Sequence, residues 1–375
     1  MTVLGNTALS FTEEQAMLLD VARDFCRDKS PLSTVREHLE SGPGFDAGLW
    51  REIAELGWCG ISLPESCGGS GLGVGALVPV LEAMGRAMLT TPLLSTALAG
   101  QLLLRAAGQE RAESWLADIA AGSAATVAWL EGGDWGDPAI HSTVDAGGAL
   151  SGQKRFVVDA GVAALILVPV MQGDEPALAL LRRENLPDGA LTPNVLIDQT
   201  RRSANLHLDG ISVDPADIVT GPQVERALAD TRLLGALLVA AEAAGSAGAC
   251  LDTVVEYLKT RKQFGKLIGS YQALKHPCVD ILLGLDDARS FIYHAATLVH
   301  DGPLDADAEI ACRMAKAQAC EVLSYAGDRA VQFHGGMGFT WECDAQLYIR
   351  RAQWSQQQFG DPQHHRKRLA TLLLD

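Results

Sequence analysis

The sequence has little that would bind a metal ion or nucleic acid, and little suited to crossing a membrane. Its eight cysteines are scattered, without a Cys-x-x-Cys pair or zinc-like spacing, so we expect reduced thiols, no disulfides and no metal. No cluster of five or six basic residues occurs in a chain of net charge −16, which argues against nucleic acid and a polybasic anchor. A signal peptide and an uninterrupted apolar run of about 18 residues are also missing. These absences predict a cytoplasmic protein that binds neither nucleic acid nor membrane.

What is present divides the chain into three parts. At 375 residues the chain is longer than one hydrophobic core usually covers, so two or three domains are expected. Residues 1–122 have a helical pattern that opens with a capping box, Thr12 followed by Gln15. Further helices are expected in this part at 47–55, 75–89, 94–107 and 110–120.

The remaining two parts differ in their secondary-structure pattern. Residues 123–222 contain short β-rich runs separated by Gly, Asp and Pro, typical of a small antiparallel sheet or barrel. Residues 223–375 return to long Ala- and Leu-rich stretches, which suit an antiparallel four-helix bundle. These helices are expected at 224–258, 270–300, 305–333 and 344–359. The sequence therefore predicts an α+β protein with an N-terminal helical domain, a β-barrel middle domain and a C-terminal four-helix bundle.

Two motifs in the last third of the chain are specific. The first is Arg-Lys-Gln-Phe-Gly at 261–265, where one expected helix ends, and the second is Gln-Phe-His-Gly-Gly-Met-Gly-Phe-Thr at 332–340. The glycine-rich loop at 63–71 follows no strand and has no Lys-Ser/Thr, so it indicates a turn and not a nucleotide site. Together with this loop, the segment 200–210 and the helix–sheet–helix order, the two motifs resemble the acyl-CoA dehydrogenase family over essentially the whole chain.

The resemblance implies an FAD flavoenzyme, usually a tetramer, that removes the α-proton and the β-hydride of an acyl thioester. It also implies that the flavin takes the hydride and that an electron-transfer flavoprotein or another acceptor takes the electrons. By resemblance, six residues hold the ADP half of the FAD of a neighbouring subunit: Arg261, Gln263, Phe264, Gln332, Gly335 and Gly336.

Physical chemistry agrees with this placement. The guanidinium of Arg261 is a planar, permanently charged fork suited to a pyrophosphate, and glycine lets the backbone approach a ligand closely. The alternative is that Arg261 caps its helix and that Gly335 and Gly336 only form a turn.

The catalytic base of the family is missing from both of its usual positions. In many members a Glu precedes a Gly in the loop after the last bundle helix, and the equivalent residues here are Phe359 and Gly360. Other members place the Glu on the first bundle helix, 26 residues before the motif arginine, where this chain has Gly235.

Glu242 is the nearest acid on the first bundle helix and is our candidate for the base. It lies seven residues beyond Gly235, about 20° off the same face but roughly 10 Å farther along the axis. A lone Glu among Ala and Gly is costly to bury unpaired, and such placements are often functional. The alternative is an ion pair with a neighbouring helix or subunit, such as an Arg across the bundle. Asp361, which precedes Pro362, is a second candidate, although its position favours turn chemistry.

The middle part also departs from the family where the flavin ring is usually held. A Thr-Glu-Pro stretch whose Thr contacts the flavin is replaced by Leu130-Glu131-Gly132. The position of a Trp that often packs on the flavin has Phe156, and Val158 replaces the usual Thr. Several hydrogen-bond donors to the flavin are thereby lost, which indicates a ring that is loosely held or absent from this chain's own pocket.

Three functions remain open at this point. The first is an active acyl-CoA dehydrogenase with a displaced base, working as a homotetramer. The second is a non-catalytic subunit of a heterotetramer, which completes the FAD site of a second dehydrogenase-like chain. The third is a flavoprotein that acts on a substrate other than a thioester. The sequence does not identify the acyl group.

Overall fold

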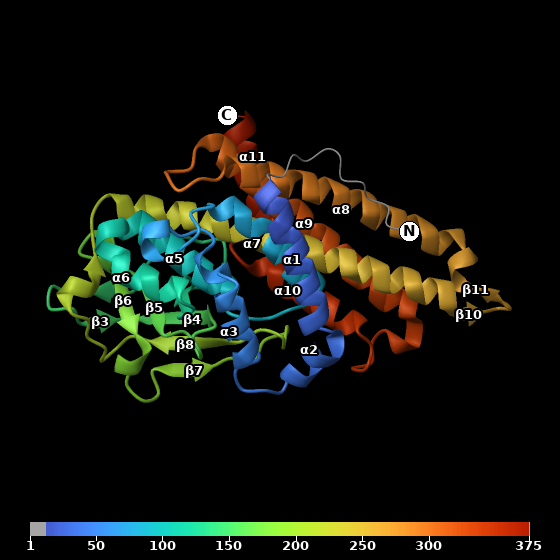
Figure 1. The fold of residues 1–375 in the computed structure, drawn as a ribbon, viewed down its shortest axis with the longest axis horizontal. Helices are drawn as coiled ribbons and strands as arrows, with labels where there is room; N and C mark the ends of the chain where they lie inside the picture. The colour runs from blue at the N-terminus through green and yellow to red at the C-terminus, as the bar shows by residue number, and fades with distance from the viewer. Residues whose placement is uncertain (1–12, 375) are drawn as a thin grey trace.

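A computed structural model describes residues 13–374, with the strands gathered at one end and the long helices α7, α8 and α9 extending to the other (Figure 1). The order of helices, sheets and helices confirms the expected α+β fold. The expected capping box depends on Thr12, which lies outside the described residues. The first part contains α1 (Glu13–Lys29), α2 (Leu32–His38), α3 (Ala47–Glu55), α4 (Leu77–Arg86), α5 (Leu93–Ala107) and α6 (Gln109–Ala120).

Helix α3 shows how local sequence sets these elements. The side chain of Asp46 accepts hydrogen bonds from the amides of Gly48 and Leu49, which satisfies two donors at the helix N-terminus. On the inner face Trp50 is buried, and its indole nitrogen donates to the carbonyl of Gly122 at 2.9 Å. This contact ties the N-terminal helices to the start of the β region.

The β region forms two sheets. The larger has the order β3-β2-β5-β6-β9 with β1 also on β5, and the smaller has the order β4-β8-β7. Strand β5 pairs in parallel with both β1 and β2, so the expectation of a purely antiparallel sheet is wrong at these two pairings. The strands are β1 (Ala125–Val127), β2 (Thr143–Val144), β3 (Leu150–Ser151), β4 (Gln153–Val158), β5 (Leu165–Gln172), β6 (Glu175–Arg182), β7 (Leu191–Pro193), β8 (Ser203–His207) and β9 (Ile218–Val219).

The C-terminal part is built around α7, which packs against α4, α8 and α9. A β-carbon at Gly245 would lie 1.9 Å from the carbonyl oxygen of Glu82, and one at Gly85 would lie 2.0 Å from that of Glu242. Glycines therefore let the backbones of α4 and α7 touch. The elements are α7 (Gln223–Thr260), β10 (Lys262–Gln263), β11 (Lys266–Leu267), α8 (Gln272–Leu298), α9 (Ala306–His334), α10 (Ala345–Gln357) and α11 (Pro362–Leu374).

Helix α7 is long and apolar enough to cross a membrane by length and composition, but 89% of its apolar window is buried inside the protein. That burial is what a core helix shows, and the neighbouring helices provide it.

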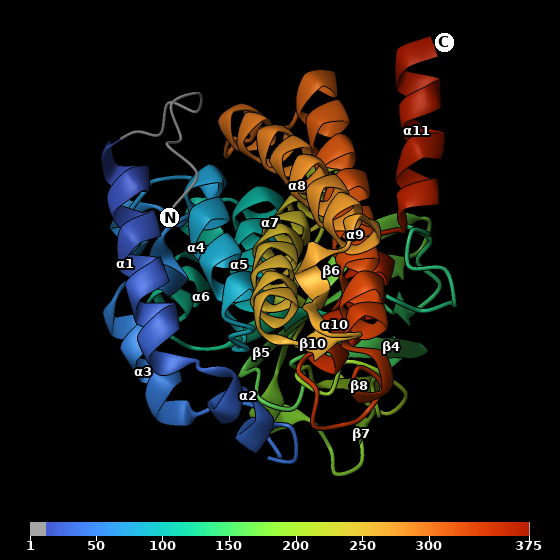
Figure 2. The same ribbon diagram turned by 90° about the vertical axis from the view of Figure 1, so that its right-hand side faces the viewer.

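Helix α11 is a helix that the sequence analysis did not anticipate. Pro362 is the first residue of α11, a position where the missing amide hydrogen of a proline costs nothing. The side chain of Asp361 accepts from the amide of His364 at 2.7 Å and so caps the helix. Helix α11 then packs along α9 at the margin of the bundle (Figure 2).

Candidate functional site

The six residues predicted to bind ADP line one hollow at the far end of the bundle, here called the hairpin hollow. One wall is the β10–β11 hairpin, which joins α7 to α8 at the end opposite the sheets (Figure 1). Its two turn residues, Phe264 and Gly265, both have positive φ, 53° and 75°. Such a turn closes a two-residue hairpin, but it is unusual for a Phe and leaves that side chain 88% exposed. A strained, exposed aromatic residue indicates a contact with something outside the chain.

The opposite wall of the hairpin hollow is the end of α9. Gln332 lies in the last turn, and Gly335 ends the helix with a φ of 61°. A β-carbon built on Gly335 or Gly336 meets no atom within 4 Å, so both glycines face open space. Behind them the rings of Tyr257 and His334 stack at 4.1 Å. The hollow therefore combines an open backbone cradle with an aromatic floor.

Arg261 is exposed at the rim of the hairpin hollow. Its backbone amide donates to Tyr257 at 2.9 Å, and within residues 13–374 its guanidinium has neither an ion pair nor a hydrogen bond. The side chain therefore does not cap its own helix, which was the alternative to ligand binding. Its charge is free to meet an anion.

Phe359 and Gly235, which the resemblance places at the two base positions of the family, pack against each other. A β-carbon at Gly235 would lie 2.5 Å from the ring of Phe359. The ring also meets Trp129 edge-on, with 6.0 Å between centroids. Phe359 has a φ of 59°, a left-handed conformation that costs a non-glycine residue free energy.

Lys316 holds the loop that positions Phe359, and the sequence analysis missed it. It is fully buried on α9, and its ammonium donates to the carbonyls of Ser355 at 2.9 Å, Gln356 at 3.2 Å and Gly360 at 3.1 Å. A single lysine among alanines and cysteines was the available signal. The buried ammonium of Lys316 is thus satisfied by three carbonyl groups, and these contacts fix the α10–α11 connection.

An apolar pocket, here called the inner pocket, contains the residues that the resemblance places at the flavin ring, Leu130, Phe156 and Val158. Trp135 packs on Phe156 at 5.6 Å, and Leu130 and Val158 provide no hydrogen-bond donors from their side chains. Glu131 turns to the side, where it pairs with Lys154. The pocket is lined by Leu94, Ser95, Leu98, Thr126, Val127, Trp129, Leu130, Trp135, Phe156, Val158, Arg232, Trp354, Gln358 and Phe359.

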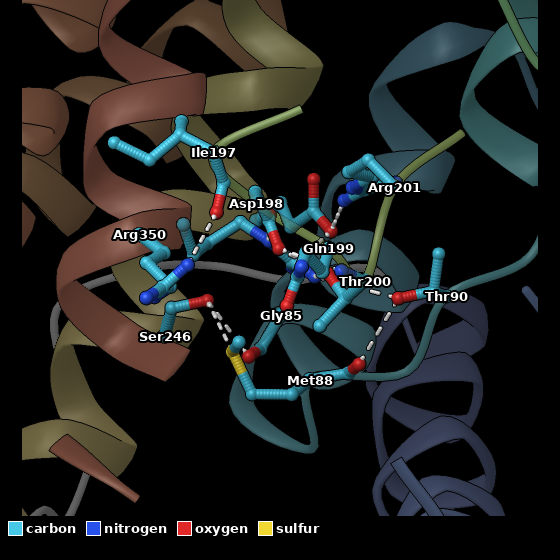
Figure 3. A network of polar contacts seen from close by, with 12 residues as sticks. Gly85, Met88, Thr90, Ile197, Asp198, Gln199, Thr200, Arg201, Ser246 and Arg350 are labelled. Carbon is cyan, nitrogen blue, oxygen red and sulfur yellow. Dashed lines mark hydrogen bonds and ion pairs between the residues drawn. The ribbon is translucent and has the colours of Figure 1, made fainter. Parts of the chain in front are cut away.

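Glu242 does not line the inner pocket and is held in a buried ion-pair network. One of its carboxylate oxygens accepts from both Arg201 and Arg351, the latter at 2.9 Å. Arg351 also donates to Asp198 at 2.6 Å and to Thr200 at 2.6 Å. Arg351 also donates to Thr90 at 3.4 Å, and Figure 3 shows Asp198, Thr200, Arg201 and Thr90 around this part of the network. Glu242 thus has the interhelical ion pair that was the alternative to a role as base.

The network connects all three parts of the chain. Thr90 belongs to the N-terminal part, Asp198 and Arg201 to the β region, and Glu242 and Arg351 to α7 and α10. Its link to the inner pocket is Arg201, whose guanidinium lies 4.5 Å from the ring centroid of Trp354. The network therefore supports the wall of the pocket without entering it.

A second buried carboxyl, Asp159, lies beside the inner pocket. It accepts a hydrogen bond from Ser95 at 2.5 Å, and burial raises its pKa to about 6. The contact joins the end of β4 to α5, so no local pattern in the sequence indicates this residue.

Comparisons with known proteins identify the family and its fold. The family model "Acyl-CoA dehydrogenase, N-terminal domain" matches residues 12–123, and "Acyl-CoA dehydrogenase, C-terminal domain" matches 224–374. Acyl-CoA dehydrogenase IpdE2 of Mycolicibacterium smegmatis is 32% identical over 96% of this chain and 98% of its own. The solved structure of a variant of the Tcur3481-Tcur3483 steroid ACAD has a TM-score of 0.85 and 30% identity, covering 96% of this chain and 98% of that one. The ChsE4-ChsE5 complex of Mycobacterium tuberculosis has a TM-score of 0.86 and 26% identity, covering 98% of both chains. The chain belongs to the acyl-CoA dehydrogenase family.

Proposed function

We propose that this chain is the base-lacking subunit of a heteromeric acyl-CoA dehydrogenase and completes the FAD site of a partner subunit. The observation that carries the proposal is the contrast between two sites. The family's base position is filled by Phe359 packed on Gly235, whereas the hairpin hollow keeps an unpaired Arg261 and open glycines. The partner subunit then supplies the carboxylate that removes the α-proton.

FAD, when bound, supplies hydride acceptance from the β-carbon of the acyl group. The residues of this chain hold its ADP half. Arg261 would bind the diphosphate as a charge-assisted fork, while the amides near Gly335 and the side chain of Gln332 would donate to its polar groups. Phe264 offers an exposed ring face to the adenine. The fit is good for this half of the cofactor.

The fit is poor for the flavin ring in this chain's own inner pocket. Leu130 and Val158 provide no donors, and Trp135 covers Phe156. Among the described residues that line the inner pocket, no carboxylate replaces the lost Glu. Glu242 is held by two arginines, Asp361 caps α11, and Asp159 lies beside the pocket, where it accepts from Ser95. We therefore place the reacting flavin in the partner's pocket.

We infer a steroid-derived acyl-CoA as the substrate of the assembly, with an electron-transfer flavoprotein or a similar carrier as the electron acceptor. The support for the substrate is the similarity to Tcur3481-Tcur3483, which is named as a steroid ACAD. The Ala- and Gly-rich stretch of α7 adds no support, because at Gly245 it serves close helix packing.

The test is to express this chain with the dehydrogenase-like chain of the same genome that has Glu at the position equivalent to Phe359. We expect that neither chain alone oxidises a steroid acyl-CoA and that the complex does. Replacing the partner's Glu by Gln should abolish flavin reduction, whereas Glu242→Gln in this chain should leave the turnover of folded complex largely unchanged. Full turnover by this chain alone would refute the proposal.

A further inference from the structure

The connection between β1 and β2 is a loop that is tied together at its base. The carboxylate of Glu131, at the start of the loop, accepts from the amides of His141 at 2.8 Å and Ser142 at 3.0 Å at its end. The same carboxylate pairs with Lys154, which is fully buried. Residues 132–140, here called the tryptophan loop, therefore form a compact loop whose two ends meet at one side chain. Figure 2 shows this blue-green loop beside the start of α11.

A turn within the tryptophan loop sets the place of Trp135. The carboxylate of Asp134 accepts from the amide of Gly136 at 2.8 Å, and the carbonyl of Asp134 accepts from the amide of Asp137 at 3.2 Å. Such contacts are typical of a turn that an Asp residue begins, and Trp135 is its second residue. The most bulky side chain of the loop therefore lies at its tip.

The tip of the tryptophan loop is held against the wall of the inner pocket. The indole of Trp135 lies on the ring of Phe156, with 5.6 Å between centroids. The carbonyl of Trp135 accepts from Arg232 on α7 at 3.0 Å. Burial lowers the pKa of Arg232 to about 10, so its guanidinium remains charged near neutral pH and the bond is charge-assisted. A β-carbon at Gly136 would lie 2.5 Å from the ring of His364, so the loop also packs closely on α11.

Trp135 leaves little free space in the inner pocket. The cavity volume there is about 50 Å³, which is room for about four water molecules and not for a flavin ring. The hairpin hollow, by comparison, has about 580 Å³. The resemblance places the flavin ring beside Phe156, and in this chain an indole covers that side chain. The indole and a bound flavin ring would therefore compete for one place.

We propose that Trp135 determines which of the two unlike chains holds the flavin, because its indole fills this chain's inner pocket in place of the ring. The missing donors at Leu130 and Val158 weaken the binding of a flavin, whereas Trp135 excludes it by volume. This inference rests on the proposed function, which assigns the flavin to the partner. Binding of a flavin ring to this chain is nevertheless measured apart from the turnover of the complex, so the two proposals can fail separately.

The experiment measures the binding of riboflavin to the purified full-length chain by the quenching of riboflavin fluorescence. Riboflavin has the flavin ring without the ADP half, so the hairpin hollow does not contribute. Trp135→Ala is the main variant, and Trp135→Phe is the conservative one, because it keeps a ring in the pocket. Ile140→Ala is the matched control, since Ile140 belongs to the same loop and is half-buried but does not line the inner pocket.

Arg232→Met is a second variant, which keeps the indole and removes the bond to the carbonyl of Trp135. Thermal melting shows whether each variant is folded. Hydrogen exchange of residues 132–140 shows whether the tryptophan loop has been released. We expect faster exchange in Arg232→Met and a gain in riboflavin affinity that is smaller than that of Trp135→Ala.

We expect Trp135→Ala to bind riboflavin about tenfold or more tighter than wild type, with Trp135→Phe and Ile140→Ala close to wild type. Equal affinity in wild type and Trp135→Ala, whether both bind or neither does, would overturn the proposal. An equal gain in Ile140→Ala would assign the effect to a loosened loop and remove the role of Trp135. If Trp135→Ala does not fold, unchanged exchange and unchanged affinity in Arg232→Met would overturn the proposal.

Discussion

The ring of Phe359 occupies the space that a side chain at Gly235 would need. Phe359 adopts a left-handed backbone conformation, which costs about 1 kcal/mol or more, and nevertheless holds its ring against Gly235. The edge-on contact with Trp129 and the carbonyl contacts of Lys316 offset this cost. Positions 235 and 359 are therefore structurally coupled, because a side chain at position 235 would displace the ring of Phe359.

The first prediction concerns Gly235→Ala. Helix propensity alone would make this change stabilising by about 1 kcal/mol. We expect it to destabilise the protein by about 1–3 kcal/mol, because the new methyl group would lie 2.5 Å from the ring of Phe359. Denaturant unfolding gives the sign. In a Phe359→Ala background the cost should disappear, and a cost that persists there would assign it to other contacts.

The second prediction uses the pKa of Asp159, which burial raises to about 6. In the unfolded chain the value is about 3.9, so the folded state holds the proton more tightly. The contribution of this group to the free energy of unfolding therefore falls as pH rises from about 4 to 6 and stays low above that. The groups that face it are Ser95, Arg201, Arg202 and Glu242.

Asp159→Asn removes this dependence and keeps an oxygen for Ser95, and Asn tolerates the positive φ of 57° at this position. Relative to wild type, the variant should gain about 1–2 kcal/mol of stability between pH 4.5 and pH 7.5. Parallel unfolding curves at the two pH values measure this. If the variant instead loses stability relative to wild type as the pH rises from 4.5 to 7.5, Arg201 and Arg202 outweigh burial in setting the pKa of Asp159.

At the scale of elements, Lys316 links α9 to the α10–α11 connection. The third prediction is that Lys316→Met destabilises the protein by about 1–3 kcal/mol, since it removes the ammonium donor from the buried carbonyl of Gly360 and leaves that of Ser355 with only the thiol of Cys320. Lys367→Met, on the exposed face of α11, is the control and should change little. Thermal melting measures the loss, and hydrogen exchange should become faster in residues 355–360. Unchanged exchange there would show that the loop holds its shape without Lys316.

Elements whose signals are local were predictable from the sequence. The expected helix at 47–55 matches α3, which has a capping Asp46, and the expected helix at 110–120 differs from α6 by one residue. Helix α11 was missed because a proline can end one helix or begin the next, and only the bond from His364 to Asp361 decides between them. The parallel pairings of β5 depend on contacts between distant segments, which no short pattern encodes.

The candidate site divides in the same way. The hairpin hollow was found because Arg261 and Gln332 belong to two continuous motifs that end neighbouring helices. Lys316, Trp135 and Asp159 were missed because each acts through a partner far away in the chain. Glu242 was identified as unusual, but its arginine partners come from other elements, so its role required the structure.

At the scale of the whole molecule, two different sites lie at the two ends of helix α7. The hairpin hollow and the inner pocket lie at opposite ends of α7, since Arg261 follows its last residue and Arg232 lies in its first turns. Under the proposed function, the hairpin hollow of one chain would therefore serve the flavin held in the pocket of a second chain. The hollow offers the predicted ADP-binding residues, and Leu130 and Val158 in the inner pocket provide no side-chain donors for a flavin ring.

The last prediction follows from this division and concerns FAD stoichiometry in the assembly with the partner chain. Only the partner's pocket should hold a flavin ring, so we expect one FAD for each pair of unlike chains. Arg261→Ala in this chain should then lower the FAD retained after gel filtration by tenfold or more, since one charge-assisted contact contributes about 1.5–3 kcal/mol. Melting of the FAD-free protein should not change, because Arg261 is exposed, lies after the last residue of α7, and its guanidinium has no ion pair or hydrogen bond within residues 13–374. Absorbance of released flavin against total protein gives the ratio. Two FAD per pair would show that the inner pocket of this chain also binds the ring, and full retention in Arg261→Ala would remove the hairpin hollow from the cofactor site.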